Sequence, residues 1–270
     1  MLGKTPTKRK YSGPGDQTQQ PKRPKKSLAD DLICPISLEL PLDPVTAEDG
    51  RVYDRESIEE HFKTTNQGTL KSPITREKMG SKLLPAIQHR NTIEALIDAH
   101  IIEKGLATKW RQRMHQKKQM DKLFKKAEAG DGEAMYNIGY NFERGQDGFK
   151  RDPKLAFPWF KRASEAGHVL STAVIGNCYL QGFAVDKCLY KGIMFVTTGA
   201  NKGSPWAAYL LGMAFADGQH GVTVDRSVAI HWLRQALKNQ TTTMLSAVNI
   251  RETIQKLKEL KAKQGSFTSP

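Results

Sequence analysis

The sequence predicts two folded modules: a small α+β module at residues 28–103 and an all-α superhelical repeat domain at residues 127–240. Two observations lead to this prediction. In the first module, short apolar runs broken by proline and glycine turns precede a stretch with helical periodicity. In the second, a glycine–aromatic–glycine pattern recurs with starts 37 and 36 residues apart. A chain of 270 residues is long enough for two such cores.

The net charge of +14 is distributed unevenly, and this limits the classes of function. Residues 1–26 carry +7, residues 27–103 carry −6, residues 104–126 carry +8 and residues 127–270 carry +5. An acidic module between two basic stretches argues against a chain devoted to nucleic acid. The longest nearly apolar stretch, 205–216, is shorter than the roughly 18 residues of a membrane span. No membrane partner is therefore expected.

The cysteines and the first residues bear on location. Cys34, Cys178 and Cys188 cannot form a disulfide framework and lack the paired spacing of a zinc site, which suits a reducing compartment. The basic N-terminal stretch has no apolar segment behind it, unlike a secretory signal. Nucleus, cytoplasm or both are expected.

Residues 1–27 are predicted to form a disordered basic tail. Basic clusters at 8–10 and 22–26 are separated by eleven residues with almost no apolar side chains. The two clusters resemble a bipartite nuclear localisation signal, which would make a nuclear import receptor a partner. The alternative is a solvated tail that touches RNA or nothing.

The α+β module is predicted as loop, short strand, turn, second strand and central helix, in that order. A proline-broken apolar run at 31–37 is followed by a turn at 48–50 and a strand that includes Tyr53. Asp54 is a candidate N-cap of a helix that runs to Thr64. One face of a final helix comprises Ile93, Leu96, Ile97 and Ile101.

A set of short motifs runs through the whole module in order. They are Cys34-Pro35-Ile36-Ser37-Leu38-Glu39, Asp43-Pro44-Val45, Gly50-Arg51-Val52-Tyr53-Asp54-Arg55, Ile58, Ser72-Pro73-Ile74-Thr75-Arg76, Leu84-Pro85 and Ile93. With these residues the module resembles a U-box, the domain of one class of ubiquitin ligases. One departure is Ala86, where many family members have asparagine; it removes one internal hydrogen bond.

Metal is excluded by counting ligands. The related RING fold binds two zinc ions through eight Cys or His ligands. Residues 28–103 offer only Cys34, His61, His89 and His100. We therefore expect no metal and no cofactor. The resemblance implies that hydrogen bonds and salt bridges take the place of zinc, and ordinary surface polarity is the alternative for the same side chains. The candidates are Ser37, Glu39, Asp43, Asp54, Arg55 and Thr75.

The resemblance also implies partners, namely ubiquitin and a ubiquitin-charged conjugating enzyme that docks on two loops and the central helix. Ile36 and Leu38 on the first loop and Pro73 on the second would make the apolar contact, with core packing as the alternative for Ile36 and Leu38. Arg76 is implied to bridge the conjugating enzyme and ubiquitin and to orient the thioester for attack, unless it is a plain surface cation. The apolar neighbours of Cys34 favour burial over a nucleophilic role.

Residues 104–126 are predicted to form a basic linker helix. Nine Lys or Arg side chains accompany apolar residues at helical spacing. A solvated face with an apolar seam is expected, and binding of RNA or an acidic partner is the alternative.

The repeat domain is predicted to contain two helices per unit, with small residues where the helices cross and an aromatic residue beside each crossing. Aligned by their first glycines, the units place Trp159 and Trp232 at the same position, with Val196 replacing tryptophan in the middle unit. The predicted repeat core comprises Gly139, Phe142, Gly145, Trp159, Gly176, Tyr179, Gly182, Gly212, Phe215, Gly218 and Trp232.

The array resembles Sel-one-like repeats, which are related to tetratricopeptide repeats. In that family the repeats bind other proteins, which implies a protein substrate or adaptor as partner. A partial unit ends at Asp131, residues 241–263 are expected to cap the array, and residues 264–270 form a tail.

Together these features predict a zinc-independent ubiquitin-protein ligase of U-box type that recruits its substrate through helical repeats. Two alternatives remain. One is a protein-interaction scaffold whose U-box no longer docks productively, and the other is a nuclear RNA-associated adaptor that binds through the basic stretches.

Overall fold

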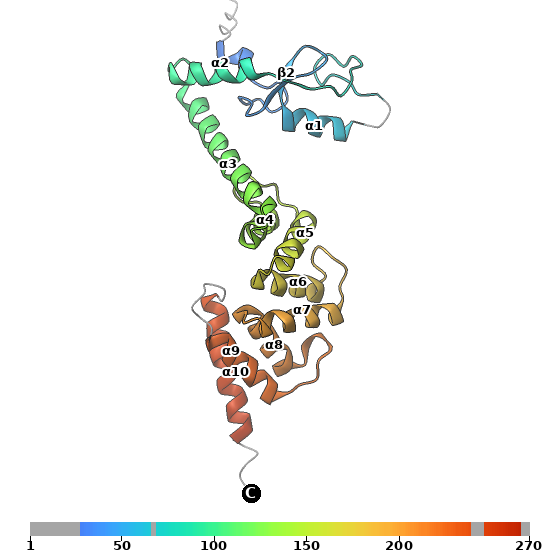
Figure 1. The fold of residues 1–270 in the computed structure, drawn as a ribbon, viewed down its shortest axis with the longest axis vertical. Helices are drawn as coiled ribbons and strands as arrows, with labels where there is room; N and C mark the ends of the chain where they lie inside the picture. The colour runs from blue at the N-terminus through green and yellow to red at the C-terminus, as the bar shows by residue number, and fades with distance from the viewer. Residues whose placement is uncertain (1–27, 66–68, 239–245, 266–270) are drawn as a thin grey trace, which may run out of the picture. The chain divides into compact units, whose positions relative to one another are not determined.

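The computed structural model describes residues 28–65, 69–238 and 246–265 (Figure 1). The basic clusters at 8–10 and 22–26 lie outside these residues. The chain divides into two compact units, 1–110 and 111–270, which are described separately. Among the described helices, none combines the length and the apolar character needed to cross a membrane.

The first unit is built around a small antiparallel sheet. Its strand order is β2-β1-β3, with Val45 paired to Tyr53 on one side and to Pro85 on the other. The elements are η1 (Leu28–Leu32), β1 (Pro44–Thr46), β2 (Val52–Asp54), α1 (Arg55–Thr64), β3 (Leu84–Pro85) and α2 (Ile87–Asp98). The predicted order of loop, strand, turn, strand and helix is confirmed.

The core of this unit brings its loops together. One cluster of buried residues in this core comprises Cys34, Val45, Ala47, Tyr53 and Ile58. Half-buried apolar residues from the loops and from α1 pack around them: Ile36, Phe62, Met79 and Leu83. Burial of apolar surface is the main favourable term in folding, so both long loops are anchored by their own apolar side chains.

The helix ends differ from the prediction in two respects. Asp54 stands at the N-cap of α1, but its carboxylate accepts hydrogen bonds from the amides of Leu42 (3.2 Å) and Asp43 (3.3 Å) rather than from α1. Asp54 therefore fixes the backbone of residues 42–43, which lead into β1. Helix α2 ends at Asp98, so Ile101 lies beyond it and is exposed. Ala86, with no side-chain acceptor, leaves the start of α2 uncapped.

The predicted basic helix is confirmed as α3 (Lys104–Glu128). Most of its lysines are exposed, whereas Trp110, Met114 and Ala127 are buried. Trp110 is the last residue of the first unit, and residues 111–128 of the helix belong to the second.

Within the described residues, the second unit comprises residues 111–128 of α3, three helix pairs and one further helix (Figure 1). The helices of a pair are antiparallel, because Gly132 at the start of α4 lies against Ala166 at the end of α5. The pairs are α4 (Gly132–Arg144) with α5 (Pro153–Glu165), α6 (Val169–Gln181) with α7 (Leu189–Asn201), and α8 (Pro205–Asp217) with α9 (Arg226–Lys238). A short helical turn, η2 (Gln219–Gly221), follows α8, and α10 (Ala247–Gly265) comes last.

The six recurring glycines have two different roles. Gly139, Gly176 and Gly212 lie where paired helices cross; an added Cβ would come within 2.8, 2.6 and 2.6 Å of the facing side chain. Those facing side chains belong to Phe160, Val196 and Leu233. The other three are helix C-caps in the left-handed region, with φ values of +69°, +71° and +68°, rather than core residues. They are Gly145, Gly182 and Gly218.

The middle pair has a turn one residue shorter than its neighbours, which corrects the predicted alignment. The amides of Asp152 and Asp225 donate to carbonyls ten residues earlier, whereas the amide of Cys188 donates to Tyr179, nine residues earlier. Counted from these N-caps, the equivalent of Trp159 and Trp232 is Phe195, not Val196. Counting from the first glycine missed this because the turn itself varies.

Each tryptophan contacts its own helix pair and also reaches the helices that precede that pair. The Trp159 ring meets Phe124 of α3 edge-on, with centroids 5.6 Å apart. Trp232 of α9 packs against a cluster that includes Val196 and Ala200 of the preceding pair. The residues that fill the crossings are the ones next in sequence, facing the inner glycines. The aromatic residue at this position therefore joins its own helix pair to the helices that precede the pair.

Helix α10 covers the end of the array; of the predicted capping segment 241–263, residues 241–245 lie outside the described residues. Leu260 is buried against α9, and Tyr209 on α8 donates to the Glu252 carboxylate at 2.5 Å. Lys256 forms an ion pair with Asp217 at 2.6 Å. These contacts close the apolar face that the last pair would otherwise expose.

Gly176→Ala should destabilise the array by about 1–3 kcal/mol, because the new Cβ would lie 2.6 Å from a Val196 methyl and 2.8 Å from the Val196 backbone nitrogen. Urea unfolding of the full chain, followed by tryptophan fluorescence, measures the effect. Gly105→Ala is the control, since its nearest neighbour would be 3.6 Å away. An unchanged free energy of unfolding for Gly176→Ala would contradict the close crossing.

Candidate functional site

The first loop of the first unit, residues 33–43 between η1 and β1, is closed by hydrogen bonds within its own backbone. The amide of Cys34 donates to the carbonyl of Glu39, and the amide of Leu38 donates to the carbonyl of Cys34, both at 2.9 Å. Leu38 lies in the left-handed region, with φ of +57°, and 73% of its surface is exposed. A β-carbon makes this conformation unfavourable. The loop therefore holds an apolar side chain out into solvent at a conformational cost.

Ile36 and Leu38 have separate environments. Ile36 is half-buried and packs on the core cluster around Cys34. Leu38 is exposed. Core packing, the alternative for both residues, therefore describes Ile36 better than Leu38. Cys34 itself is fully buried, and its sulfur accepts a hydrogen bond from the Asp54 amide at 3.2 Å. Its surroundings are those of a structural cysteine.

The second loop lies between α1 and β3, and its residues 69–83 are organised around one serine. Ser72 is 1% exposed, and its hydroxyl donates to the Asp49 carboxylate at 2.6 Å. The same hydroxyl oxygen accepts from the amides of Ile74 (3.2 Å) and Thr75 (3.0 Å). The backbone of Ser72 also pairs with Arg76 and Glu77. One buried side chain thus fixes the whole turn.

This turn presents a short surface. Pro73 is half-buried at its start and Ile74 is 43% exposed beside it. Arg76 is exposed and, like Leu38, lies in the left-handed region, with φ of +64°. Among the described residues, no carboxylate pairs with its guanidinium, which leaves the Arg76 donors available to a partner.

Asp49 links the second loop to the sheet. Besides Ser72, it accepts a hydrogen bond from the Tyr53 hydroxyl at 2.7 Å and one from the Arg51 amide at 3.1 Å. Burial raises the pKa of Asp49, but these hydrogen bonds and the charge of Arg51 outweigh burial, so the net pKa falls below 3.8. Burial, with the hydrogen bond to Asp49, raises the pKa of Tyr53.

Three of the six predicted network residues form one cluster. Arg55 donates to Asp43 at 2.8 Å, and Asp54 fixes the backbone beside Asp43. Glu39 forms an ion pair elsewhere, with Lys109 of α3. Thr75 accepts only a long local bond from the Glu77 amide at 3.4 Å. The buried Ser37 hydroxyl has no hydrogen-bond partner in the described part of the chain, so it does not join the network.

The residues that hold the second loop were not predicted from the sequence. Asp49, Tyr53 and Ser72 come from three segments and meet only in the folded unit. Glu48 was also missed; its carboxylate accepts from the Gly80 amide at 2.7 Å and the Lys82 amide at 3.4 Å. The acidic pair in the turn before a strand was a weak local signal, because such residues are common in turns.

Within the described residues, no three His, Cys, Asp or Glu side chains are grouped so that they could hold a metal ion. The two loops are instead held by the carboxylate contacts of Asp49, Asp43, Asp54 and Glu48. Charge-assisted hydrogen bonds of this kind are stronger than neutral ones.

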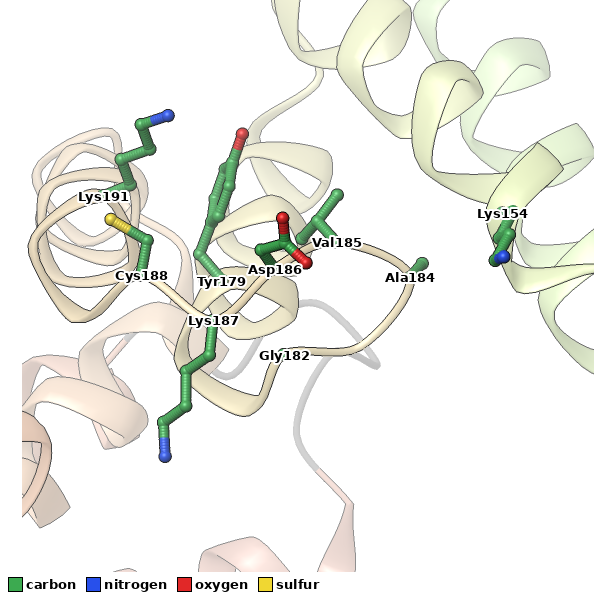
Figure 2. A pocket seen from close by; sticks show the side chains of 9 residues that line it. All are labelled: Lys154, Tyr179, Gly182, Ala184, Val185, Asp186, Lys187, Cys188 and Lys191. Atoms are coloured by element: carbon green, nitrogen blue, oxygen red, sulfur yellow. The ribbon is translucent and has the colours of Figure 1, made fainter.

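The second unit contains a hollow of about 660 Å³ beside the turn between α6 and α7 (Figure 2). Tyr179 and Lys191 extend to the same side of the turn, and Lys154 of α5 lies across from them. Lys187 extends to the opposite side (Figure 2). The lining residues are Lys154, Tyr179, Gly182, Ala184, Val185, Asp186, Lys187, Cys188 and Lys191.

The Tyr179 ring forms the floor of an aromatic cluster. It stacks on Phe195 at 5.9 Å and meets Phe157 edge-on at 5.7 Å. The ammonium of Lys191 lies 5.5 Å from its centroid. The hollow therefore combines a rigid aromatic wall with an excess of positive charge over the single carboxylate of Asp186.

Comparisons with known proteins agree with both units. The U-box domain family model matches residues 28–102, and the Sel1 repeat model matches residues 132–168 and 207–240. The gap between the two Sel1 matches contains the pair with the shorter turn. In that pair Cys188 replaces the capping aspartates 152 and 225.

Relatives with similar segments are much longer than this chain. U-box domain-containing protein 19 of Arabidopsis thaliana is 37% identical over 78 residues, 28% of this chain and 10% of that protein. The ERAD-associated E3 ubiquitin-protein ligase component HRD3B of the same plant is 34% identical over 100 residues, 37% of this chain and 15% of that protein. A solved Sel1 repeat protein from Oxalobacter formigenes is 27% identical, with a TM-score of 0.43, over 57% of this chain and 73% of that one.

Asp49→Asn should lower the free energy of unfolding of the first unit by about 2 kcal/mol at neutral pH, because a charged acceptor for three donors is lost. The lowered pKa of Asp49 means that its contribution is complete above the usual value of 3.8 and is lost as the pH falls through the folded-state value. Chemical unfolding between pH 7 and pH 3 should therefore show a flatter acid dependence for Asp49→Asn. The exposed Glu56→Gln is the control; equal slopes for wild type and Asp49→Asn would contradict the role of Asp49.

Proposed function

We propose that this chain, which carries a U-box domain at residues 28–102 and Sel1 repeats at 132–168 and 207–240, is a ubiquitin-protein ligase that docks a charged conjugating enzyme. The observation that supports this best is the pair of closed loops, each of which holds one outward-facing residue in a left-handed backbone conformation: Leu38 on the first and Arg76 on the second.

The apolar part of the docking surface is centred on Leu38. A leucine that is 73% exposed contributes little to folding, and its loop is already ordered by two backbone hydrogen bonds. A partner that covers Leu38 gains apolar burial without paying to order the loop. Pro73 and the exposed Ile74 extend the surface on the second loop. Ile36 supports it from beneath through the core.

The role proposed for Arg76 is orientation. Its backbone is fixed by the bond from its amide to the Ser72 carbonyl at 3.0 Å, while its guanidinium is exposed. A planar group with five donors can hold carbonyl groups of two proteins at once. Fixing the thioester lowers the entropy cost of reaching attack geometry.

The chemical step then needs no bond to this chain. A substrate lysine amine attacks the thioester carbonyl, a carbon–nitrogen bond forms, and the carbon–sulfur bond to the conjugating enzyme breaks with its cysteine as leaving group. Cys34, the cysteine of residues 28–103, is buried and accepts a hydrogen bond, which supports transfer without a covalent ligase intermediate.

The repeats are proposed to recruit the substrate or an adaptor, and the hollow beside α7 suits an acidic segment. Lys154 and Lys191 flank the Tyr179 wall. On α7 nearby, Tyr190 is 79% exposed and Met194 is 44% exposed, one turn apart. Exposed aromatic and methionine side chains beside cations are typical of peptide-binding surfaces.

Leu38→Ala should weaken binding of a conjugating enzyme roughly tenfold, because an exposed aliphatic contact at an interface is lost. Arg76→Ala should instead slow ubiquitin discharge from the charged enzyme more than it weakens binding of the uncharged one. Both effects are measured with purified full chain, by titration and by single-turnover discharge to free lysine. Discharge should persist in the presence of a zinc chelator.

The matched control is Leu84→Ala, which removes another exposed leucine of the same unit, outside the two loops. It should behave like wild type. If no member of a panel of conjugating enzymes supports discharge, the scaffold function is favoured instead; steeply salt-dependent RNA binding would favour the RNA adaptor.

The double variant Lys154→Glu, Lys191→Glu should reduce co-purification of acidic partners from extract and weaken binding of a Glu-rich peptide that carries one aromatic residue. The control is a second pair of exposed lysines of the repeats that do not line the hollow, changed together as Lys202→Glu, Lys238→Glu, which shifts the net charge by the same amount. Equal loss in the double variant and the control would show that net charge, and not the hollow, governs recruitment.

A further inference from the structure

Helix α3 begins as part of the first unit, and two of its side chains bond to residues of the first loop. The indole N–H of Trp110 donates to the carbonyl of Pro41 at 3.1 Å, and Trp110 is only 6% exposed. One residue earlier, Lys109 forms an ion pair with Glu39. Both partners follow Leu38 closely in the chain. The contacts join positions 69 and 70 residues apart in sequence.

The two ends of the first loop are held by different elements. At its start, the Cys34 sulfur accepts from the Asp54 amide. At its end, the Pro41 carbonyl lies in a buried residue, and a buried carbonyl without a donor would cost free energy. Trp110 supplies that donor. The exposed Leu38 lies between these two anchors.

We propose that Trp110 and, to a lesser extent, Lys109 are positioning residues for the conjugating-enzyme contact: the first turns of α3 fix residues 39–41 and thereby set the place of Leu38. This inference rests on the proposed function. Its consequence is that the docking unit extends through Trp110, beyond the 28–102 segment that the U-box family model matches.

The two contacts should differ in size. Trp110 is buried, so losing its N–H leaves a buried acceptor unmet. The side chain of Lys109 is 61% exposed, and exposed ion pairs contribute little. Trp110→Phe should therefore weaken conjugating-enzyme binding by roughly three- to tenfold, and Lys109→Met by about twofold or less.

Hydrogen exchange in the free full chain tests the anchor itself. In Trp110→Phe, which removes the donor and keeps most of the ring, the amides of Cys34 and Leu38 should exchange roughly tenfold faster. The amides of Ser72 and Arg76 in the second loop should be unchanged. Trp206→Phe, in the repeats, is the control. Unchanged exchange in the first loop, or equal acceleration in both loops, would overturn the proposal.

A double-mutant cycle tests the positioning role. In a Leu38→Ala background, Trp110→Phe should cause little further loss of binding, because the side chain that it positions is gone. In a Pro73→Ala background, the two losses should multiply. A general loss of stability would give full multiplication in both backgrounds and would overturn the proposal.

The outcomes separate the two levels of inference. A wild-type chain that binds no conjugating enzyme overturns the proposed function, and with it the docking role of Trp110. A wild-type chain that binds normally, combined with a Trp110→Phe variant of equal affinity, overturns the positioning role alone.

Discussion

The first unit depends on one carboxylate. Asp49 accepts three hydrogen bonds, two of them from side chains of the sheet and of the second loop. Without it, the Ser72 hydroxyl would lose its acceptor and the turn that presents Pro73 and Arg76 would lose its tie to the sheet. A unit with three short strands has little regular hydrogen bonding, so side chains must satisfy its loop backbone. Distributed carboxylates do this locally.

Much of the fold follows from sequence periodicity, because local spacing determines helices and their crossings. The two-module architecture, the central helix up to Thr64, the basic helix and the three helix pairs are all confirmed. The starts 37 and 36 residues apart indicate one residue fewer in the middle repeat, but periodicity does not show that it is missing from the turn before Cys188. That shift led to pairing Val196 with Trp159, whereas hydrogen bonds identify Phe195 as the equivalent residue.

The candidate site was less predictable. A family resemblance in the sequence predicts Leu38, Pro73 and Arg76 as site residues, but not the groups that hold them. Asp49 and Ser72 are 23 residues apart, and Trp110 and Pro41 are 69 apart. Such pairs meet only through the tertiary fold, and polar residues in turns are too common to single out. Ser37 and Thr75 match the family pattern, yet the Ser37 hydroxyl has no partner in the described residues, and Thr75 joins the second loop through its backbone amide, which donates to Ser72, rather than through its hydroxyl.

The replacement of a capping aspartate by Cys188 changes the local field of the repeats. In α5 and α9, Asp152 and Asp225 accept from first-turn amides and place negative charge at the helix start, whereas α7 has no side-chain cap there. The positive end of the α7 dipole is therefore left open next to Lys191. An approaching carboxylate would be attracted over about 10 Å at roughly 0.1 M salt, over longer distances in dilute buffer and over shorter ones as more salt is added. For the acidic partner proposed above, the middle pair should thus influence how fast it arrives, besides how tightly it is held.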